Sequence, residues 1–252
     1  MLSQLIWWSS IALETVLLAR GLRNRLAHRL PVFYGYIVFV VLQDVARFFT
    51  YEWNLQVYRA IYWVTEFLGL AIGSLVVFQI YKVSLAAYPG AARMARNALA
   101  FVFLTALAKG LATTPASPLG WQTASTAALE MERALRAVQA AAILALVALF
   151  LLYSIPFGRN LRGILLGYGL FVGERVVCVT FVSLQTHDFW FYAYSASYLA
   201  ALSLWLGYLW SYQPTPVPKG SLQLEYDYQR IAAATRRRLQ ETSGYLRRVV
   251  RS

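Results

Sequence analysis

Long apolar stretches alternate with short polar segments along the chain, and this pattern predicts a bundle of membrane-spanning helices. A helix needs about 20 predominantly apolar residues to cross the hydrocarbon core of a bilayer. Seven stretches approach or exceed this length, of which the fourth is short, and they cover residues 5–19, 31–50, 60–81, 98–113, 129–155, 161–184 and 189–212. We expect an all-α, polytopic membrane protein with seven transmembrane helices. Polar turns are expected at 51–59 and around Pro89 to Arg96.

The composition supports the same class of protein. Hydrophobic residues make up 59% of the chain and charged residues 13%, whereas soluble proteins have about 45–50% and about 25%. The net charge of +12 would suggest nucleic acid as the partner of a soluble protein. Here the basic residues lie in short loops and in the tail, so we expect the lipid bilayer and no nucleic acid. The single cysteine, Cys178, excludes an intrachain disulfide.

The distribution of basic residues predicts the orientation. The loops after spans one, three and five and the tail together hold seventeen Lys and Arg. The opposite side holds four, which are Arg59, Lys109, Arg133 and Arg136. The positive-inside rule then places the N-terminus outside and the C-terminus in the cytoplasm of a bacterial inner membrane. The first stretch lacks a basic segment and a small-residue cleavage site, so we expect it to remain as a helix.

The last segment differs in character from the rest. Prolines at 214, 216 and 218 end the seventh span, which divides the chain into a bundle, 1–213, and a cytoplasmic basic tail, 214–252. A helix is expected over 221–252, with apolar residues loosely at helical period among arginines. Its two interpretations are a solvated anchor of the topology and a docking site for anionic lipids or for a protein partner. The residues concerned are Leu222, Ile231, Leu239, Leu246 and Val250, and Arg230, Arg236, Arg237, Arg238, Arg247 and Arg248.

Ionisable residues inside the spans are the candidates for function. A charged side chain near the centre of a bilayer costs roughly 2.5–3.5 kcal/mol on insertion scales. Most of these residues fall at the middle or in the outer half of their spans, and they are Asp44, Arg47, Glu66, Arg136, Glu174 and Arg175. They must therefore be paired, face water or serve a function.

Two interpretations of these charges stay open. In the structural one, Asp44, Glu66 and Glu174 pair with Arg47, Arg175 and Arg136 and fix the bundle. In the functional one, the same residues surround an outward-opening pocket for a small polar or charged ligand. The pocket would be rimmed by Tyr58, Tyr62 and Trp63.

Several chemistries lack the residues they need. The histidines are His28 and His187, both outside the spans, so we expect no haem ligation, no metal site and no cofactor. The sequences H-E-x-x-H, G-x-S-x-G and G-x-x-x-x-G-K-[ST] are absent, and we expect no enzyme activity. Glu130, Glu132, Arg133 and Arg136 resemble the Glu-rich helix of CAAX-type proteases, but the intramembrane histidines of that family are absent. We interpret this segment as an ion-paired helix start.

Two resemblances concern the whole chain. Span two opens with LPVFYGY and carries Asp44 and Arg47, and span six follows IPFGRNLRGILLGYG and carries Glu174 and Arg175. Spans one to three and five to seven would then be parallel repeats joined by span four, a 3-1-3 layout that resembles the SWEET and PQ-loop transporters, although no Pro-Gln pair occurs. Pro31-x-Phe33-x-x-Tyr36, Tyr62-Trp63-x-x-Glu66 and Tyr88-Pro89 also resemble motifs of uncharacterised seven-helix bacterial membrane proteins. That resemblance implies no activity.

These observations favour a receptor or sensor with a charged pocket in the outer half of the bundle, which signals through a cytoplasmic or membrane protein partner. One alternative is a transporter for a small polar solute, with Glu66 and Glu174 as coupling groups near the midplane. Another is a structural subunit of a membrane complex.

Overall fold

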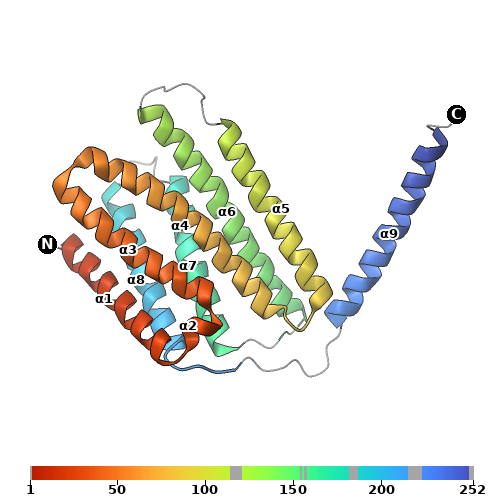
Figure 1. Cartoon of the computed structure of the whole chain (residues 1–252), viewed down its shortest axis with the longest axis horizontal. Helices are drawn as coiled ribbons and strands as arrows, with labels where there is room; N and C mark the ends of the chain where they lie inside the picture. The colour runs from red at the N-terminus through yellow and green to blue at the C-terminus, as the bar shows by residue number, and fades with distance from the viewer. Residues whose placement is uncertain are drawn as a thin grey trace.

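Every regular element among the described residues is an α-helix, as expected (Figure 1). The computed structural model describes residues 2–113, 121–153, 155, 158–181, 187–214 and 223–249. The helices are α1 (Leu2–Arg23), α2 (Leu26–Arg29), α3 (Pro31–Trp53), α4 (Leu55–Ser84), α5 (Pro89–Thr113), α6 (Trp121–Tyr153), α7 (Arg159–Phe181), α8 (His187–Tyr208) and α9 (Gln223–Val249).

Five of these helices are long and apolar enough to cross a membrane over their described residues. The qualifying segments are Gln4–Arg23, Pro31–Tyr51, Leu55–Ser84, Pro89–Ala108 and Leu129–Tyr153. They belong to α1, α3, α4, α5 and α6. The chain is therefore a helical protein with several apolar helices that suit a membrane, while the expected seven passes stay a prediction.

Two expected polar turns are wrong because helix caps shorten them. The turn expected over 51–59 consists of Asn54 alone, whose side-chain oxygen accepts hydrogen bonds from the backbone N–H groups of Gln56 (2.9 Å) and Val57 (3.3 Å). This N-cap satisfies two donors at once, so α4 begins directly after α3 ends. Likewise α5 already begins at Pro89, since proline suits the first position of a helix.

Six helices form a closed ring, and α5 lies outside it. Around the ring, α1 packs on α3, α3 on α4, α4 on α6, α6 on α7, α7 on α8, and α8 on α1. The helix α5 packs against α4 and α6, and Figure 1 shows it at the edge of the bundle. Large buried side chains fill the centre of the ring near the start of α3. Among them are Phe33 of α3 and Trp205 of α8, whose ring centroids lie 5.1 Å apart.

Glycines allow the closest approaches between ring helices. A Cβ atom at Gly163 or Gly167 of α7 would overlap Tyr208 or Trp205 of α8. A Cβ atom at Gly73 of α4 would overlap the Tyr168 hydroxyl of α7. Small residues let helix backbones approach closely in membranes, and here they bring α4, α7 and α8 around a common centre.

The tail forms the expected helix, α9, and its first turns dock on α5. The Glu225 carboxylate accepts a hydrogen bond from the backbone N–H of Gly90 (3.1 Å), and the Tyr153 hydroxyl lies 3.5 Å from an Asp227 carboxylate oxygen. Beyond this contact α9 runs away from the bundle (Figure 1). Its arginines at 230, 236, 237 and 238 are exposed. Leu222 and Val250, included in the expected apolar set, lie outside the described residues.

Candidate functional site

Glu66 is the centre of a buried cluster of charges. Its carboxylate is paired with Arg47 of α3 (3.2 Å), Arg136 of α6 (3.1 Å) and Arg175 of α7 (3.4 Å). Glu66 itself lies on α4, so one carboxylate connects four helices of the ring. Loss of one partner from such a buried group would leave a charge without compensation.

A second acid completes this cluster. Glu132 of α6 is 2% exposed and accepts a hydrogen bond from Nε of Arg175 at 2.8 Å. It also lies 3.9 Å from Nε of Arg136, one helical turn away. We call the five residues Arg47, Glu66, Glu132, Arg136 and Arg175 the arginine cluster. With three arginines and two glutamates, it has a surplus of one positive charge.

Polar neighbours satisfy much of the remaining hydrogen-bonding capacity of the arginine cluster. Arg47 donates to the Thr65 hydroxyl from Nε (3.0 Å) and Nη2 (2.8 Å), and to the carbonyl oxygen of Tyr62 (3.1 Å). Gln139 lies within 3.5 Å of Nη1 of Arg136 and donates to the Leu70 carbonyl oxygen and the Ser74 hydroxyl, both at 3.1 Å. The arginine cluster is thus a well-supported structural connection between helices.

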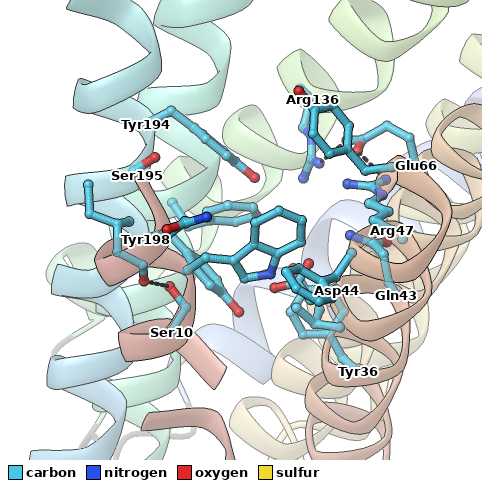
Figure 2. Close-up of a pocket in the computed structure, with 18 residues that line it drawn as sticks. Ser10, Tyr36, Gln43, Asp44, Arg47, Glu66, Arg136, Tyr194, Ser195 and Tyr198 are labelled. Carbon is cyan, nitrogen blue, oxygen red and sulfur yellow. Dashed lines mark hydrogen bonds and ion pairs between the residues drawn. The ribbon is translucent and has the colours of Figure 1, made fainter. Parts of the chain in front are cut away.

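A cavity of about 590 Å³ lies beside the arginine cluster, inside the ring (Figure 2). Its volume falls within the roughly 300–1,000 Å³ of small-molecule sites. Its lining comes from α1, α3, α4, α6, α7 and α8, and comprises Gln4, Ile6, Trp7, Ser10, Tyr36, Val40, Gln43, Asp44, Arg47, Phe48, Tyr51, Glu66, Gly69, Arg136, Phe171, Tyr194, Ser195 and Tyr198. The lining residues of α1 lie in its first half and those of α3 extend to Tyr51, so the cavity lies in the half of the bundle that holds the N-terminus.

Asp44 lies in the cavity wall and outside the arginine cluster. It makes no ion pair or hydrogen bond within the described part of the chain, although Arg47 is three residues away on the same helix. Arg47 instead turns to Glu66 and Thr65. The pairing of Asp44 with an arginine, expected on the structural interpretation, is therefore wrong.

Glu174 also lies apart from the arginine cluster and does not line the cavity. One of its carboxylate oxygens accepts a hydrogen bond from the Cys178 thiol, and the other is buried without a hydrogen bond. Its neighbour Arg175 points into the cluster, since adjacent residues on a helix face different directions. The sequence suggested Glu174 as a partner of an arginine, but in the structure Glu132 is the acid that pairs with Arg175.

The three aromatic residues expected at the rim lie along α4 beside the cavity and do not line it. Tyr58 packs edge-on against Tyr51 at 5.3 Å, and Trp63 stacks on Phe67 at 6.2 Å. The Tyr62 ring lies under the guanidinium group of Arg47, 4.4 Å from it. The aromatic lining comes from other helices instead, with Trp7, Tyr36, Phe48, Tyr51, Phe171, Tyr194 and Tyr198.

Another acid, Glu14 of α1, is buried behind the cavity. It is 0% exposed and accepts a hydrogen bond from the hydroxyl group of Tyr198, a cavity residue of α8. Its second oxygen has no hydrogen bond, and no ion pair reaches it from the described residues. Glu14 therefore joins α1 to α8 through a hydrogen bond with Tyr198.

Sequence reasoning missed several of these residues for identifiable reasons. Glu132 precedes Arg136 by four residues, and this spacing indicated a local pair at a helix start. Such local pairs are present, Glu130–Arg133 at 2.6 Å and Glu132–Arg136 at 3.9 Å, but Glu132 makes its shorter contact with Arg175 of α7, at 2.8 Å. The cavity residues of α1 and α8 lie in nearly uniform apolar or aromatic stretches. Such stretches carry no periodic signal for the side that faces a cavity.

The site offers charges, hydrogen-bonding groups and aromatic surfaces, which together suit the binding of a polar ligand. Within the described residues, no group of three or more His, Cys, Asp or Glu side chains is placed to hold a metal ion. The chain matches no protein-family model, no curated protein and no solved structure.

Proposed function

We propose that this is a multi-pass inner-membrane protein of receptor or sensor type that binds a small polar ligand in the cavity. The observation that carries the proposal is the cavity itself, with Asp44 in its wall. A carboxylate without a protein partner at this depth in a membrane bundle is costly unless water or a ligand solvates it. A ligand that pairs with Asp44 would relieve this cost.

The proposed orientation makes the cavity accessible to ligands from outside the cell. The seven-pass topology with its N-terminus outside places the first half of α1 toward the outer surface. Gln4 and Trp7 of that half line the cavity. In this orientation α3 runs outward from Pro31 to Trp53, so Arg47 lies about one turn nearer the outer surface than Asp44. The arginine cluster therefore flanks the ligand, and a change in its pairing would alter the contacts between four helices. We assign no catalytic role to its residues, because they are paired with one another.

The tail is proposed to meet the cytoplasmic surface and to bind anionic lipids there. The exposed arginines of α9 support this, since each basic residue near an anionic surface contributes about 1 kcal/mol. The full chain can be tested in nanodiscs whose lipids are either neutral or contain phosphatidylserine. Protection of α9 from trypsin in anionic but not in neutral nanodiscs is the expected result, and equal cleavage in both would contradict it.

Ligand binding can be tested by filling the cavity. A Cβ atom at Gly69, in the cavity wall, would meet only Phe39 and Gln43 at ordinary contact distances of 3.5 and 3.6 Å. Gly69→Phe therefore places a ring in the cavity. Gly173→Phe is the matched control, since nothing lies within 4 Å of a Cβ atom there.

The expected readout is the set of small molecules released when the purified proteins are denatured, measured by mass spectrometry. A compound should accompany the wild type and Gly173→Phe but not Gly69→Phe. Identical contents in all three preparations would contradict the proposal.

A transporter is the second candidate, and the arrangement of the ring favours it. The helices α1, α3 and α4 and the helices α6, α7 and α8 each pack in sequence, and α5 joins the two sets from outside the ring. This agrees with parallel repeats around a central site. Uptake of the copurifying compound into proteoliposomes by the wild type, lost in Asp44→Asn, would favour transport over reception.

A further inference from the structure

The charges of the cavity wall are of both signs and are separated in space. Asp44 forms no ion pair or hydrogen bond with the described residues, since Arg47, one turn along α3, pairs with Glu66 instead. Arg47 and Arg136 belong to the arginine cluster, which has one positive charge in excess. Figure 2 shows Asp44 below the guanidinium groups of Arg47 and Arg136 in the view, with Tyr194, Ser195 and Tyr198 across the cavity.

This separation determines which ligand charge fits. A simple cation would compensate Asp44 but would add to the positive excess of the arginine cluster. A simple anion would compensate that excess but would leave Asp44 unpaired. Uncompensated charge is costly where the surroundings are of low dielectric constant. A ligand with one charge of each sign compensates both.

The aromatic side chains around Asp44 suit an ammonium group. Phe48 and Tyr51 follow Asp44 by four and seven residues on α3 and therefore share its face of the helix. Trp7 of α1 packs edge-on against Phe48 at 5.5 Å. The faces of aromatic rings attract cations, and this attraction would add to that of the Asp44 carboxylate. Near the arginine cluster, the guanidinium carbon of Arg136 lies 5.3 Å from the centroid of the Phe171 ring, so this ring already contacts a cation of the protein.

We propose that the cavity takes a small zwitterion, with an ammonium group at Asp44 and a carboxylate or other acidic group facing Arg47 and Arg136. This inference rests on the proposed function and gives its ligand a chemical class. The cavity of about 590 Å³ accommodates a molecule of the size of an amino acid or somewhat larger.

The test uses three zwitterions that differ in size, L-leucine, L-phenylalanine and 6-aminohexanoate. Each is compared with its carboxamide, which is a cation, and with its deamino analogue, which is an anion. Dissociation constants follow from the ligand-dependent shift in unfolding temperature of the purified full chain in detergent. The best zwitterion is expected to bind at least about tenfold more tightly than its own amide and its own deamino analogue, because it gains one more charge-assisted contact than either.

Variants at Asp44 assign the ammonium end. Asp44→Asn should weaken zwitterion binding by about tenfold and leave or improve the binding of the anion, since the positive excess is then unopposed. Asp44→Glu retains the charge and should retain the preference for the zwitterion. The comparison of the three ligand classes on the wild type decides the inference even where Asp44→Asn does not fold.

The outcomes separate this inference from the proposed function. Tighter binding of the anion or the cation, blocked by Gly69→Phe, would overturn the zwitterion and leave the cavity as a binding site. Binding of none of these compounds would overturn the zwitterion and leave the proposed function to the test by mass spectrometry. Binding that Gly69→Phe does not change would overturn the cavity as the site, and with it both proposals. A preference for the zwitterion that persists in Asp44→Asn would overturn the role of Asp44.

Discussion

Glu66 shows how a single residue can hold four helices of a bundle together. Its carboxylate meets three arginines from α3, α6 and α7 within 3.4 Å. Removal of one member of a buried ion pair costs more than the pair contributes, because the remaining charge stays buried without compensation. Of the acids in the spans, Glu66 is therefore the one whose loss should matter most for stability.

Glu66→Gln is expected to lower the free energy of unfolding by about 3–5 kcal/mol, since three arginines would then share the charge of Glu132 alone. Unfolding by SDS in mixed micelles measures this change. Glu174→Gln is the matched control, and should cost less than about 1 kcal/mol because no described arginine pairs with Glu174. Equal losses for both variants would contradict the central place of Glu66.

Glu14 should behave differently, because its contact with Tyr198 is a hydrogen bond within a pair that lacks a cation. Glu14→Gln keeps an acceptor for the Tyr198 hydroxyl and should change stability little. Glu14→Leu leaves that hydroxyl buried and unpaired, at a cost of about 1–3 kcal/mol. In the double variant Glu14→Leu/Tyr198→Phe part of this loss should be recovered, because both polar partners are gone. A double variant less stable than Glu14→Leu would contradict this account.

At the scale of elements, α7 depends on where its glycines lie. Gly167 faces the buried indole of Trp205 in α8, whose Nε1 also donates to the Ile164 carbonyl oxygen of α7 at 3.3 Å. Gly173 lies on the same helix with open space around it. The two positions therefore have the same helical backbone but different packing.

Gly167→Ala should destabilise the protein by about 1–3 kcal/mol, because the added methyl group forces α7 and α8 apart. Gly173→Ala should be neutral or should stabilise by up to about 1 kcal/mol, since alanine favours a helix over glycine. Thermal unfolding of the two purified variants measures the contrast. A stabilising Gly167→Ala would show that the two helices are not packed closely at this point.

At the scale of the whole molecule, the ring of six helices creates the cavity, and the orientation of the ring decides which side of the membrane it serves. The proposed topology follows from the basic loops and the tail, because lysines and arginines are retained on the cytoplasmic side. It also predicts that α7 and α8 cross the membrane together with the five helices that meet the length and hydropathy requirement.

Reporter fusions test the number of passes and the orientation. Green fluorescent protein after Ser252 should fluoresce, because the C-terminus is expected in the cytoplasm. Alkaline phosphatase after Gln185, in the connection between α7 and α8, should be active, because that connection is expected outside. An inactive phosphatase at 185 together with a fluorescent C-terminal fusion would contradict the crossing of α7 and α8.

The apolar stretches alone determined that the chain is helical and approximately where its long helices lie, because hydrophobicity and helix formation are properties of neighbouring residues. The sequence also identified Arg47, Glu66, Arg136 and Arg175 as charges inside its predicted spans. Helix ends were predicted less well. Asn54 and Pro89 act through local geometry that average polarity does not report, and the polar segments around them became parts of helices.

Tertiary structure alone decided which charges meet. It turned Glu132 inward and left Glu174 with Cys178, it separated Asp44 from Arg47, and it supplied the cavity with aromatic side chains from α1 and α8. The physical reason is that the rotation of each helix about its axis depends on packing between residues far apart in the chain. A one-dimensional pattern shows that a charge lies within a span, but its partners come from the other helices of the ring.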